Sequence, residues 1–233
     1  MTSDPQIGLD VLSAPEAEAT HADGGAKRRQ IMDGARRVFL SDGFDGASMN
    51  DIARVAGVSK GTLYVYFESK EQLFEAMIRE DRKQQAERLV FPSELGDPRE
   101  VLREYGQRLI EMMTRSDMIA HVRVVVAATA KFPRLGQVFY EAGPCHGVTR
   151  LACELVKMRE AGTLSFEDPE VAAGQFIDLC KSRVFNAALF GALDPVPASV
   201  IAASVASAVE VFMRAYGAKS LSEPGCNRET ASI

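Results

Sequence analysis

The 233-residue sequence has no tryptophan, only three histidines and only four cysteines. No two cysteines have the C-x-x-C spacing of zinc and redox motifs, and four cysteines in a chain of this length do not form a disulfide framework. The motifs G-x-S-x-G, G-x-x-x-x-G-K and H-E-x-x-H are also absent from the sequence. We therefore expect no catalytic residues, no metal site and no cofactor, and we expect that the protein is not an enzyme.

Long apolar segments are missing as well. No uninterrupted apolar run approaches the roughly 18 residues that a membrane-spanning helix needs. The first residues lack the basic stretch followed by an apolar run that marks a secretory signal peptide. Because unpaired cysteines fit a reducing compartment, we expect a cytoplasmic protein with no membrane partner.

The charged residues are distributed unevenly. The net charge is −5, so the chain as a whole gives no indication that it binds nucleic acid. Residues 1–26 contain five acidic residues and no lysine or arginine, whereas residues 27–60 contain seven basic and four acidic residues. This segregation predicts a locally basic segment behind an acidic N-terminal segment.

The two ends of the sequence lack hydrophobic periodicity. Residues 1–26 mix proline, glycine, alanine and acidic residues, and we interpret them as a disordered arm. A second interpretation is that this acidic arm competes with DNA for the basic segment. Residues 218–233 are expected to form a flexible tail. Between the two ends, apolar residues recur at helical spacing and no segment has a convincing strand pattern, which predicts an all-α fold of about nine or ten helices.

The first predicted domain covers residues 27–87 and contains a helix-turn-helix at about residues 50–69. Ser48 can cap the first helix of this motif, and Asp51 resembles the partner residue of a capping box. The positive φ that the turn requires is assigned to Gly57. Ser59 can cap the second helix of the motif.

That second helix has an unusual concentration of polar and aromatic residues, which are Lys60, Gly61, Thr62, Tyr64 and Tyr66. Such side chains are suited to contacting phosphates and reading base edges in a major groove. The glycine costs roughly 1 kcal/mol inside a helix, and its bare backbone would allow DNA to approach closely. The tyrosines could instead be packing groups. The five basic residues of the preceding helix, predicted at about residues 27–41, either form a solvated face or contact phosphates.

A larger helical domain is predicted over residues 97–217. Two of its helices have clear starting signals, because Asp97-Pro98 and Asp168-Pro169 each place a capping residue before a proline at the first helical position.

The later helices of this domain are more apolar. Gly143-Pro144 is expected to kink or divide one of them. A largely apolar helix is predicted from Asp168 to about Gly191, and the last helix is predicted at residues 198–216.

The stretch SMNDIARVAGVSKGTLYVYFESKEQLF resembles the DNA-binding domain of the TetR/AcrR family of bacterial transcriptional regulators. The resemblance rests on Phe44 after Gly43, on the D-I-A core and A-G-V-S, and on the patterns T-L-Y-x-Y-F and S-K-E-x-L. The segments KFPRLGQVFYEAGP and DPEVAAGQFIDLCKS resemble the ligand-binding domain of an AefR-like branch of this family.

The resemblance implies a three-helix DNA-binding domain followed by a larger helical ligand-binding and dimerisation domain. It implies a regulator, most simply a repressor, that binds a pseudo-palindromic double-stranded operator as a homodimer. The dimer would form through helices within residues 169–216. An unidentified small-molecule effector would change the spacing of the two DNA-binding units and release the operator.

The resemblance also implies roles for individual residues. The phosphate contacts would come from Ser48, Tyr66 and Lys70. The groove-facing residues would be Lys60, Thr62 and Tyr64, with Gly61 allowing close approach. Val65 stands where the family commonly has an aromatic hydroxyl, which leaves open whether this position contacts a base.

Five residues of the larger domain are candidates for lining the effector pocket, namely Met113, His121, Phe139, Phe176 and Arg183. The methionine and the aromatic residues can equally be core residues. The arginine either extends its charge to solvent at the rim of a dimer or binds an acidic ligand.

Cys145 and Cys153 fall on consecutive helical turns, and His146 adjoins the first of them. We interpret these cysteines as small buried residues, because their spacing matches no zinc site. A redox or metal sensor is the other interpretation.

A different class of function is a helical protein-interaction adaptor that has lost operator binding, for which Val65 and the acidic arm are the support. An enzyme would need a cluster of acid and base groups that the sequence does not identify. If the dimer forms through the last helices, aspartate at Val205 or Val209 is expected to yield monomers.

Overall fold

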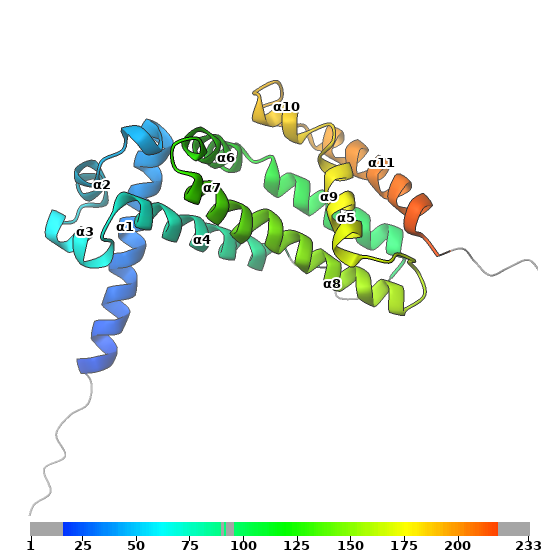
Figure 1. Ribbon diagram of the computed structural model, residues 1–233, viewed down its shortest axis with the longest axis horizontal. Helices are drawn as coiled ribbons and strands as arrows, with labels where there is room; N and C mark the ends of the chain where they lie inside the picture. The colour runs from blue at the N-terminus through cyan, green and yellow to red at the C-terminus, as the bar shows by residue number, and fades with distance from the viewer. Residues whose placement is uncertain (1–15, 90, 92–95, 219–233) are drawn as a thin grey trace, which may run out of the picture. The chain divides into compact units, whose positions relative to one another are not determined.

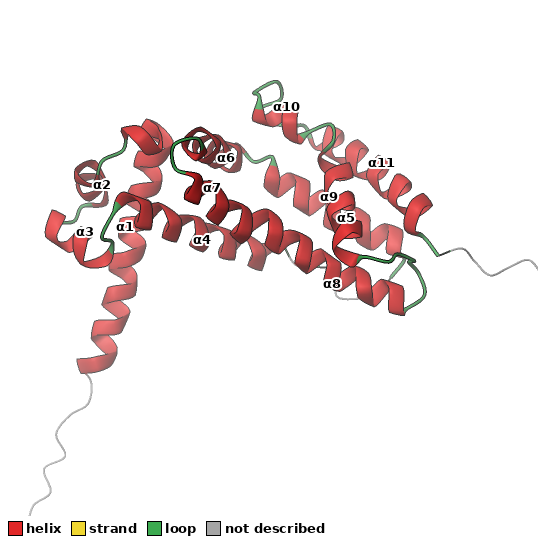
Figure 2. Cartoon of the chain, in the orientation of Figure 1, coloured by secondary structure: helices red, strands yellow, loops and turns green. Residues whose placement is uncertain are grey.

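The computed structural model describes residues 16–89, 91 and 96–218, and it describes no side chains for residues 16–23 and 86–88. Within these ranges every regular element is helical (Figures 1 and 2), and an isolated bridge joins Leu164 to Gly217. The predicted all-α fold is therefore confirmed. The chain divides into two compact units, Met1–Met77 and Ile78–Ile233.

The first unit contains α1 (Glu16–Gly46), α2 (Met49–Ala56), α3 (Lys60–Tyr66) and the beginning of α4 (Lys70–Arg88). At its centre three aromatic rings pack together. The Phe39 ring centroid lies 4.8 Å from that of Phe74 and 5.7 Å from that of Phe44. All three side chains are buried, so the end of α1 is anchored on α4.

α1 begins earlier than the sequence pattern predicts. The structure places its first residue at Glu16, whereas the prediction was a helix from about Lys27 and a disordered arm over residues 1–26. Alanine and glutamate, which dominate residues 16–19, are strong helix formers, and acidic residues are favourable at a helix N-terminus. The helix therefore extends back in spite of two consecutive glycines, and the remaining residues of the predicted arm, 1–15, lie outside the described ranges.

The second unit holds the rest of α4 and all later elements. These elements are α5 (Pro98–Met113), α6 (Ser116–Thr129), α7 (Pro133–Tyr140), the π-helical turn η1 (Glu141–Cys145), α8 (His146–Glu160), α9 (Pro169–Lys181), α10 (Phe185–Leu189) and α11 (Ala198–Tyr216). The predicted caps are present, since the carboxylates of Asp97 and Asp168 accept hydrogen bonds from backbone N–H groups of the first turns of α5 and α9.

Two helices of this unit are interrupted. The Gly143-Pro144 pair lies inside η1, where the missing N–H of the proline is accommodated by a wider turn between α7 and α8. The helix predicted from Asp168 to about Gly191 is divided into α9 and α10. At this break the N–H of Ser182 donates to the carbonyl oxygen of Leu179 and the N–H of Val184 donates to that of Lys181, which is the tighter i to i+3 pattern of a helix end.

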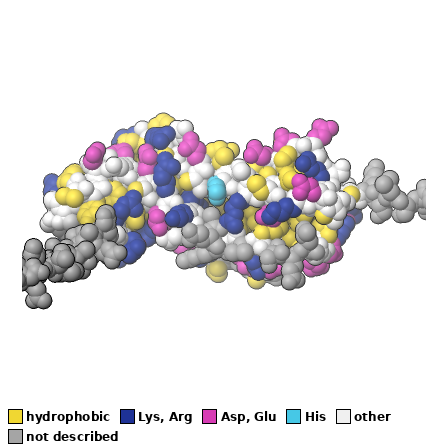
Figure 3. All heavy atoms as spheres, turned by 90° about the horizontal axis from the view of Figure 1, so that it is seen from below, with side chains coloured by type: hydrophobic (Ala, Val, Ile, Leu, Met, Phe, Trp, Pro, Cys, Tyr) yellow, Lys and Arg dark blue, Asp and Glu magenta, His cyan; other side chains and the backbone are white. Residues whose placement is uncertain are grey.

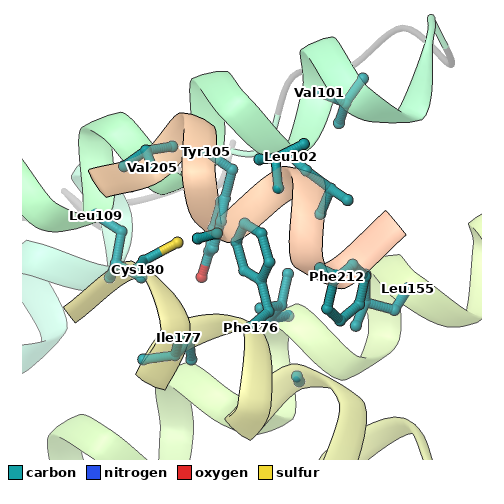
Figure 4. Close-up of a cluster of buried hydrophobic side chains, with 14 of the residues drawn as sticks. Val101, Leu102, Tyr105, Leu109, Leu155, Phe176, Ile177, Cys180, Val205 and Phe212 are labelled. Atoms are coloured by element: carbon teal, nitrogen blue, oxygen red, sulfur yellow. The ribbon is translucent and has the colours of Figure 1, made fainter. Parts of the chain in front are cut away.

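The core of the second unit forms where α5, α9 and α11 meet, with α8 alongside (Figure 4). The rings of Phe176 and Phe212 pack edge to face with their centroids 5.1 Å apart. A buried hydrogen bond from the Ser204 hydroxyl to the Cys180 carbonyl oxygen, 3.0 Å long, joins α11 to α9. This core therefore combines apolar burial with a satisfied polar contact.

α11 is a 19-residue helix that is long and apolar enough to cross a membrane by those two criteria alone. Its inward side chains pack against α5 and α9, as is typical of a core helix. Val205 and Val209 belong to this inward set, with exposed fractions of 0% and 1%. They are core residues of the monomer, so aspartate at either position tests the core of one subunit and not the dimer.

Candidate nucleic-acid interface

The turn between α2 and α3 is built as its sequence predicts. The backbone N–H of Asp51 donates to the Ser48 hydroxyl oxygen over 3.1 Å, and that hydroxyl donates to the Asp51 carboxylate over 2.5 Å. The hydrogen bond from Ser48 is the main reason that the pKa of Asp51 is lowered, followed by the one from Arg54. Gly57 ends α2 with a φ of 66°, and the Ser59 hydroxyl caps α3 by accepting from the N–H of Thr62.

α2 is fixed against α1 by close packing and by side chains that reach its last carbonyl groups. A Cβ on Gly34 would lie 2.6 Å from the Cβ of Ala56, so only glycine permits this approach. The Gln30 amide donates to the Ala56 carbonyl oxygen over 2.7 Å, and the Arg37 guanidinium donates to that of Val55 over 3.0 Å. These contacts hold the motif in a defined orientation on α1.

α3 turns one face inward and leaves the opposite face open. Leu63 and Phe67 are buried. Because successive residues of a helix are about 100° apart, Val65 lies about 160° from both of them, and Gly61 lies one turn before it on the same stripe. Val65 is 81% exposed and Tyr64 is 44% exposed. α3 therefore presents Gly61, Tyr64 and Val65 away from the protein.

Three polar groups surround this stripe. The Lys60 ammonium lies 5.9 Å from the centre of the Tyr64 ring, at the outer limit of a cation–π contact. The Thr62 hydroxyl lies 2.8 Å from that of Ser59, so part of its hydrogen-bonding capacity is used within the turn. Tyr66 is half-buried, and a Cβ on Gly24 would lie 3.9 Å from its hydroxyl oxygen, so the beginning of α1 passes beside it.

The fold does not require the glycine at position 61. A Cβ added there would meet only the Ser59 hydroxyl oxygen within 4 Å, at an ordinary contact distance of 3.8 Å, and the backbone does not have a positive φ. Since glycine is unfavourable in a helix, its presence is better explained by something that approaches α3 from outside.

Lys70 has intramolecular partners that the sequence did not predict. Its ammonium donates to the carbonyl oxygens of Phe44, Ala47 and Asp45 over 2.7, 3.0 and 3.5 Å, and it lies 4.5 Å from the centre of the Phe44 ring. An ammonium has three donors, so these carbonyl groups can occupy all of them. A phosphate contact by Lys70 stays a prediction, and the structure adds a role in holding the junction between α1 and α2.

The basic residues of α1 also have partners within the first unit. Arg36 pairs with Asp33 at 2.6 Å, and the Arg28 guanidinium lies 5.2 Å from the centre of the Phe67 ring. On the face drawn in Figure 3, lysine and arginine side chains are interspersed with acidic and apolar ones. Whether these residues also contact phosphates stays a prediction.

The structure separates the five candidates for the effector pocket. Phe176 is fully buried in the α5–α9–α11 core, and Met113 packs at the edge of that core. Arg183 is exposed at the break between α9 and α10. His121 and Phe139 lie elsewhere, each beside the second half of α4. The five residues therefore do not form one cluster.

Phe139 contacts α4 through Arg82, which was not among the predicted site residues. The Arg82 guanidinium lies 4.0 Å from the centre of the Phe139 ring and donates to the sulfur of Met118. Burial lowers the pKa of Arg82 to about 10, opposed by the charge of Asp81. A single arginine in a polar segment carries no sequence signal of such burial.

His121, on α6, lies beside Asp81, which precedes this arginine in the sequence. Its Nδ1 lies 2.7 Å from the carbonyl oxygen of Asp117, and a carbonyl oxygen only accepts hydrogen bonds, so Nδ1 carries the proton. Its Nε2 is buried without a hydrogen-bond partner, 3.8 Å from the Asp81 carboxylate. The histidine is thus a partly buried contact between α6 and α4.

Cys145 and Cys153 are exposed, which corrects their interpretation as small buried residues. The prediction of burial rested on the residue type alone, which does not determine which face of a helix a cysteine occupies. Cys180 is the buried cysteine of the described residues, and burial raises the pKa of its thiol to about 12. No group of three or more potential metal ligands occurs among the described residues.

A capped helix-turn-helix whose second helix leaves its outer face open defines the class of helix-turn-helix DNA-binding proteins. Comparison with protein families narrows this class. The family described as bacterial regulatory proteins, tetR family, matches residues 31–77, and the C-terminal domain of AefR-like transcriptional repressors matches residues 100–218. The chain belongs to the TetR family of transcriptional regulators, with an AefR-like second domain, and is not an enzyme.

Relatives with assigned names match mainly at the N-terminal end. An HTH-type transcriptional repressor of Mycobacterium tuberculosis is 43% identical over 61 residues, which are 26% of this chain and 33% of that protein. The repressor AcnR of Corynebacterium diphtheriae is 36% identical over 95 residues, which are 41% of each protein. The chain thus spans less than half the length of these relatives.

Solved structures match over most of the chain. The flavonoid-responsive regulator FrrA is 32% identical, with a TM-score of 0.76, over 84% of this chain and 100% of that one. A TetR-family regulator from Mesorhizobium loti is 26% identical, with a TM-score of 0.77, over 83% of this chain and 98% of that one. Both units of the fold are therefore shared with known regulators of this family.

Proposed function

We propose that the protein is a ligand-responsive repressor that binds a pseudo-palindromic operator as a homodimer in the cytoplasm. The observation that carries this proposal is the outer face of α3. Lys60, Tyr64 and Val65 are exposed, Val65 lies opposite the buried Leu63 and Phe67, and none of the three has a covering element among the described residues of the first unit. A helix held in this way is suited to the major groove of DNA.

The division of roles on this surface follows from side-chain chemistry. Lys60, Thr62 and Tyr64 supply donors to base edges, while Ser48, Tyr66 and Lys70 lie where α2, α3 and α4 meet the DNA backbone. Ser48 and Lys70 also have structural partners, so their phosphate contacts would add to a role in the fold. Phosphate contacts position a protein and base contacts specify the sequence.

The proposed dimer forms through the outer faces of α9 and α11. The side of α11 opposite its buried residues carries small residues in its first half, which are Ala202, Ala203, Ala206 and Ser207, and the ion pair of Glu210 and Arg214 in its second half, with Val211 at its edge. Val171 on α9 and Val211 on α11 are 50% and 48% exposed. A stripe of small residues lets two helices approach closely, and burial of this apolar area supports association.

The effector is proposed to bind in the second unit. FrrA is described as flavonoid-responsive, and because it matches both units of this chain, flavonoids are the first class of compound to test. Within the second unit Phe139 beside Arg82 and His121 beside Asp81 remain candidates, whereas Phe176 belongs to the packed core. The effector itself stays unidentified.

Selection from random duplexes tests the proposal directly. The full-length protein is incubated with a pool of double-stranded oligonucleotides, and bound duplexes are amplified through several rounds. The proposal expects enrichment of a pseudo-palindromic sequence and a complex with two subunits per duplex. If no sequence is enriched, the protein is instead the helical interaction adaptor, for which the highly exposed Val65 is the favouring observation.

A further inference from the structure

Val65, an exposed residue of α3, has no hydrogen-bonding group in its side chain. Val65 is 81% exposed and lies about 160° from both buried residues of the helix, so it points away from the core of the first unit. Gly61 precedes it by one turn on the same stripe and adds no side chain. Polar Lys60 and Tyr64 flank this stripe on one side and Thr62 on the other.

An exposed valine at this point is not explained by the protein itself. It contributes to no buried cluster, and a β-branched residue is mildly unfavourable in a helix. Removing its side chain would therefore leave the fold intact. A role for the Val65 side chain is therefore to be sought in a molecule that α3 contacts.

The major groove offers one apolar group that a valine can contact. Hydrogen-bond donors and acceptors line the edges of all four base pairs, whereas the C5-methyl group of thymine is the apolar feature that distinguishes it. A valine buried against any other base edge would cover polar atoms without satisfying them, which is unfavourable. The bare backbone at Gly61 allows the stripe to approach closely enough for van der Waals contact.

We propose that Val65 is a specificity-determining residue that reads the C5-methyl group of one thymine in each operator half-site. This inference rests on the proposed function, because it requires that α3 enters the major groove. Flanking Lys60 and Tyr64 would contact polar atoms of adjacent base pairs, so the valine selects one position within the half-site and does not provide general affinity.

Replacement of thymine by deoxyuridine tests the contact, because it removes the methyl group and leaves every hydrogen-bonding atom in place. Duplexes enriched by the wild-type protein are resynthesised with deoxyuridine at each thymine in turn, and affinities are measured by fluorescence anisotropy. Loss of one buried methyl contact is expected to weaken binding about fourfold per half-site. The same substitution is expected to leave the affinity of the Val65→Ala variant unchanged.

A matched control is Val126→Ala on α6, which removes a valine that is 63% exposed in the second unit. This variant should show the same response to deoxyuridine as the wild-type protein.

The outcomes distinguish failure of the proposed role of Val65 from failure of operator binding. If a specific operator is enriched but no thymine responds to deoxyuridine, or if the response is equal in the wild-type protein and Val65→Ala, the role of Val65 is refuted while operator binding stands. If no duplex is enriched at all, operator binding fails, and the inference fails with it.

Discussion

Lys70 combines a prediction from sequence with a role that only the structure shows. Its ammonium satisfies carbonyl groups at the end of α1 just before α2 begins. Charge-assisted hydrogen bonds of this kind contribute more than neutral ones. We expect Lys70→Met to lower the free energy of unfolding by about 2 kcal/mol in urea titrations. Lys60→Met, at an exposed position of α3, is the matched control and should change it by less than about 0.5 kcal/mol.

The same variant tests the phosphate contact implied for Lys70. If its ammonium also neutralises a phosphate, Lys70→Met reduces the slope of log affinity against log salt concentration by about 1. An unchanged slope together with reduced stability would assign Lys70 to the fold alone. Unchanged stability would contradict the structural role.

Substitution of Gly61 is expected to change the stability of the protein and its affinity for the operator in opposite directions. We expect Gly61→Ala to raise the free energy of unfolding by about 0.5–1 kcal/mol, because alanine is the better helix former and its Cβ fits. Operator affinity should nevertheless fall, since the added methyl group occupies the stripe that faces DNA. Gly147→Ala on α8, where a Cβ also has space, should stabilise the protein without affecting operator affinity.

Tyr105 and Cys180 give the second unit a dependence on alkaline pH. Burial raises the pKa of Tyr105 from 10.0 to about 12, and that of Cys180 from 9.0 to about 12. The folded protein thus holds these protons more tightly than the unfolded chain. Their contribution to stability is present below the ordinary values and is lost as the pH rises from about 9 to 12.

A Tyr105→Phe variant measures this effect. Each titrating group changes the free energy of unfolding by about 1.4 kcal/mol per pH unit. Urea titrations between pH 9 and 11 should therefore show a less steep loss of stability for Tyr105→Phe than for the wild-type protein. Equal slopes would show that the hydroxyl of Tyr105 is not buried as the structure places it.

Among the helices and turns, the sequence predicted those features that depend only on residues close together in the chain. The caps at Ser48 and Ser59 and the turn at Gly57 depend on neighbouring residues only, and the structure reproduces them. The ends of α11 were also predicted, because Pro197 and Gly217 bound a periodic apolar pattern. These signals need no knowledge of the tertiary fold.

Other features depend on residues far apart in the chain, and the sequence did not reveal them. The partners of Lys70 lie 23 to 26 residues away, and the burial of Arg82 depends on Phe139. The exposure of Cys145 and Cys153 depends on which faces of η1 and α8 other helices cover. Periodicity shows that a helix has an apolar side but does not show which partner covers it, and this limit led to the wrong placement of Val205 and Val209.

The two faces of α11 can be distinguished by a matched pair of variants. Val209 is 1% exposed and Val211 is 48% exposed. Val209→Asp would bury an unpaired charge in the core, and we expect it to unfold the second unit. Val211→Asp leaves that core intact and places charges at the proposed dimer interface.

At the scale of the whole molecule, this pair tests the assembly. Light scattering after size exclusion should report a folded monomer for Val211→Asp and a dimer for the wild-type protein, with circular dichroism confirming the helical content of both. A Val211→Asp protein with unchanged dimer mass would place the interface on a different surface.

The proposed dimer also explains how a short recognition helix can be specific for an operator. A single α3 of seven residues contacts only a few base pairs, so specificity for an operator depends on two such helices acting together. A pseudo-palindrome is the expected consequence of a two-fold dimer. An effector that alters the dimer would then alter operator affinity without contacting DNA.

Binding of the selected operator by the α3 surface is the most direct test of the whole account. Fluorescence anisotropy titrations compare the wild-type protein with a Lys60→Ala, Tyr64→Ala double variant, on the selected duplex and on a scrambled one, at several salt concentrations. We expect the double variant to bind both duplexes equally weakly while remaining a folded dimer. Undiminished preference of this variant for the selected duplex would contradict the claim that the outer face of α3 reads DNA.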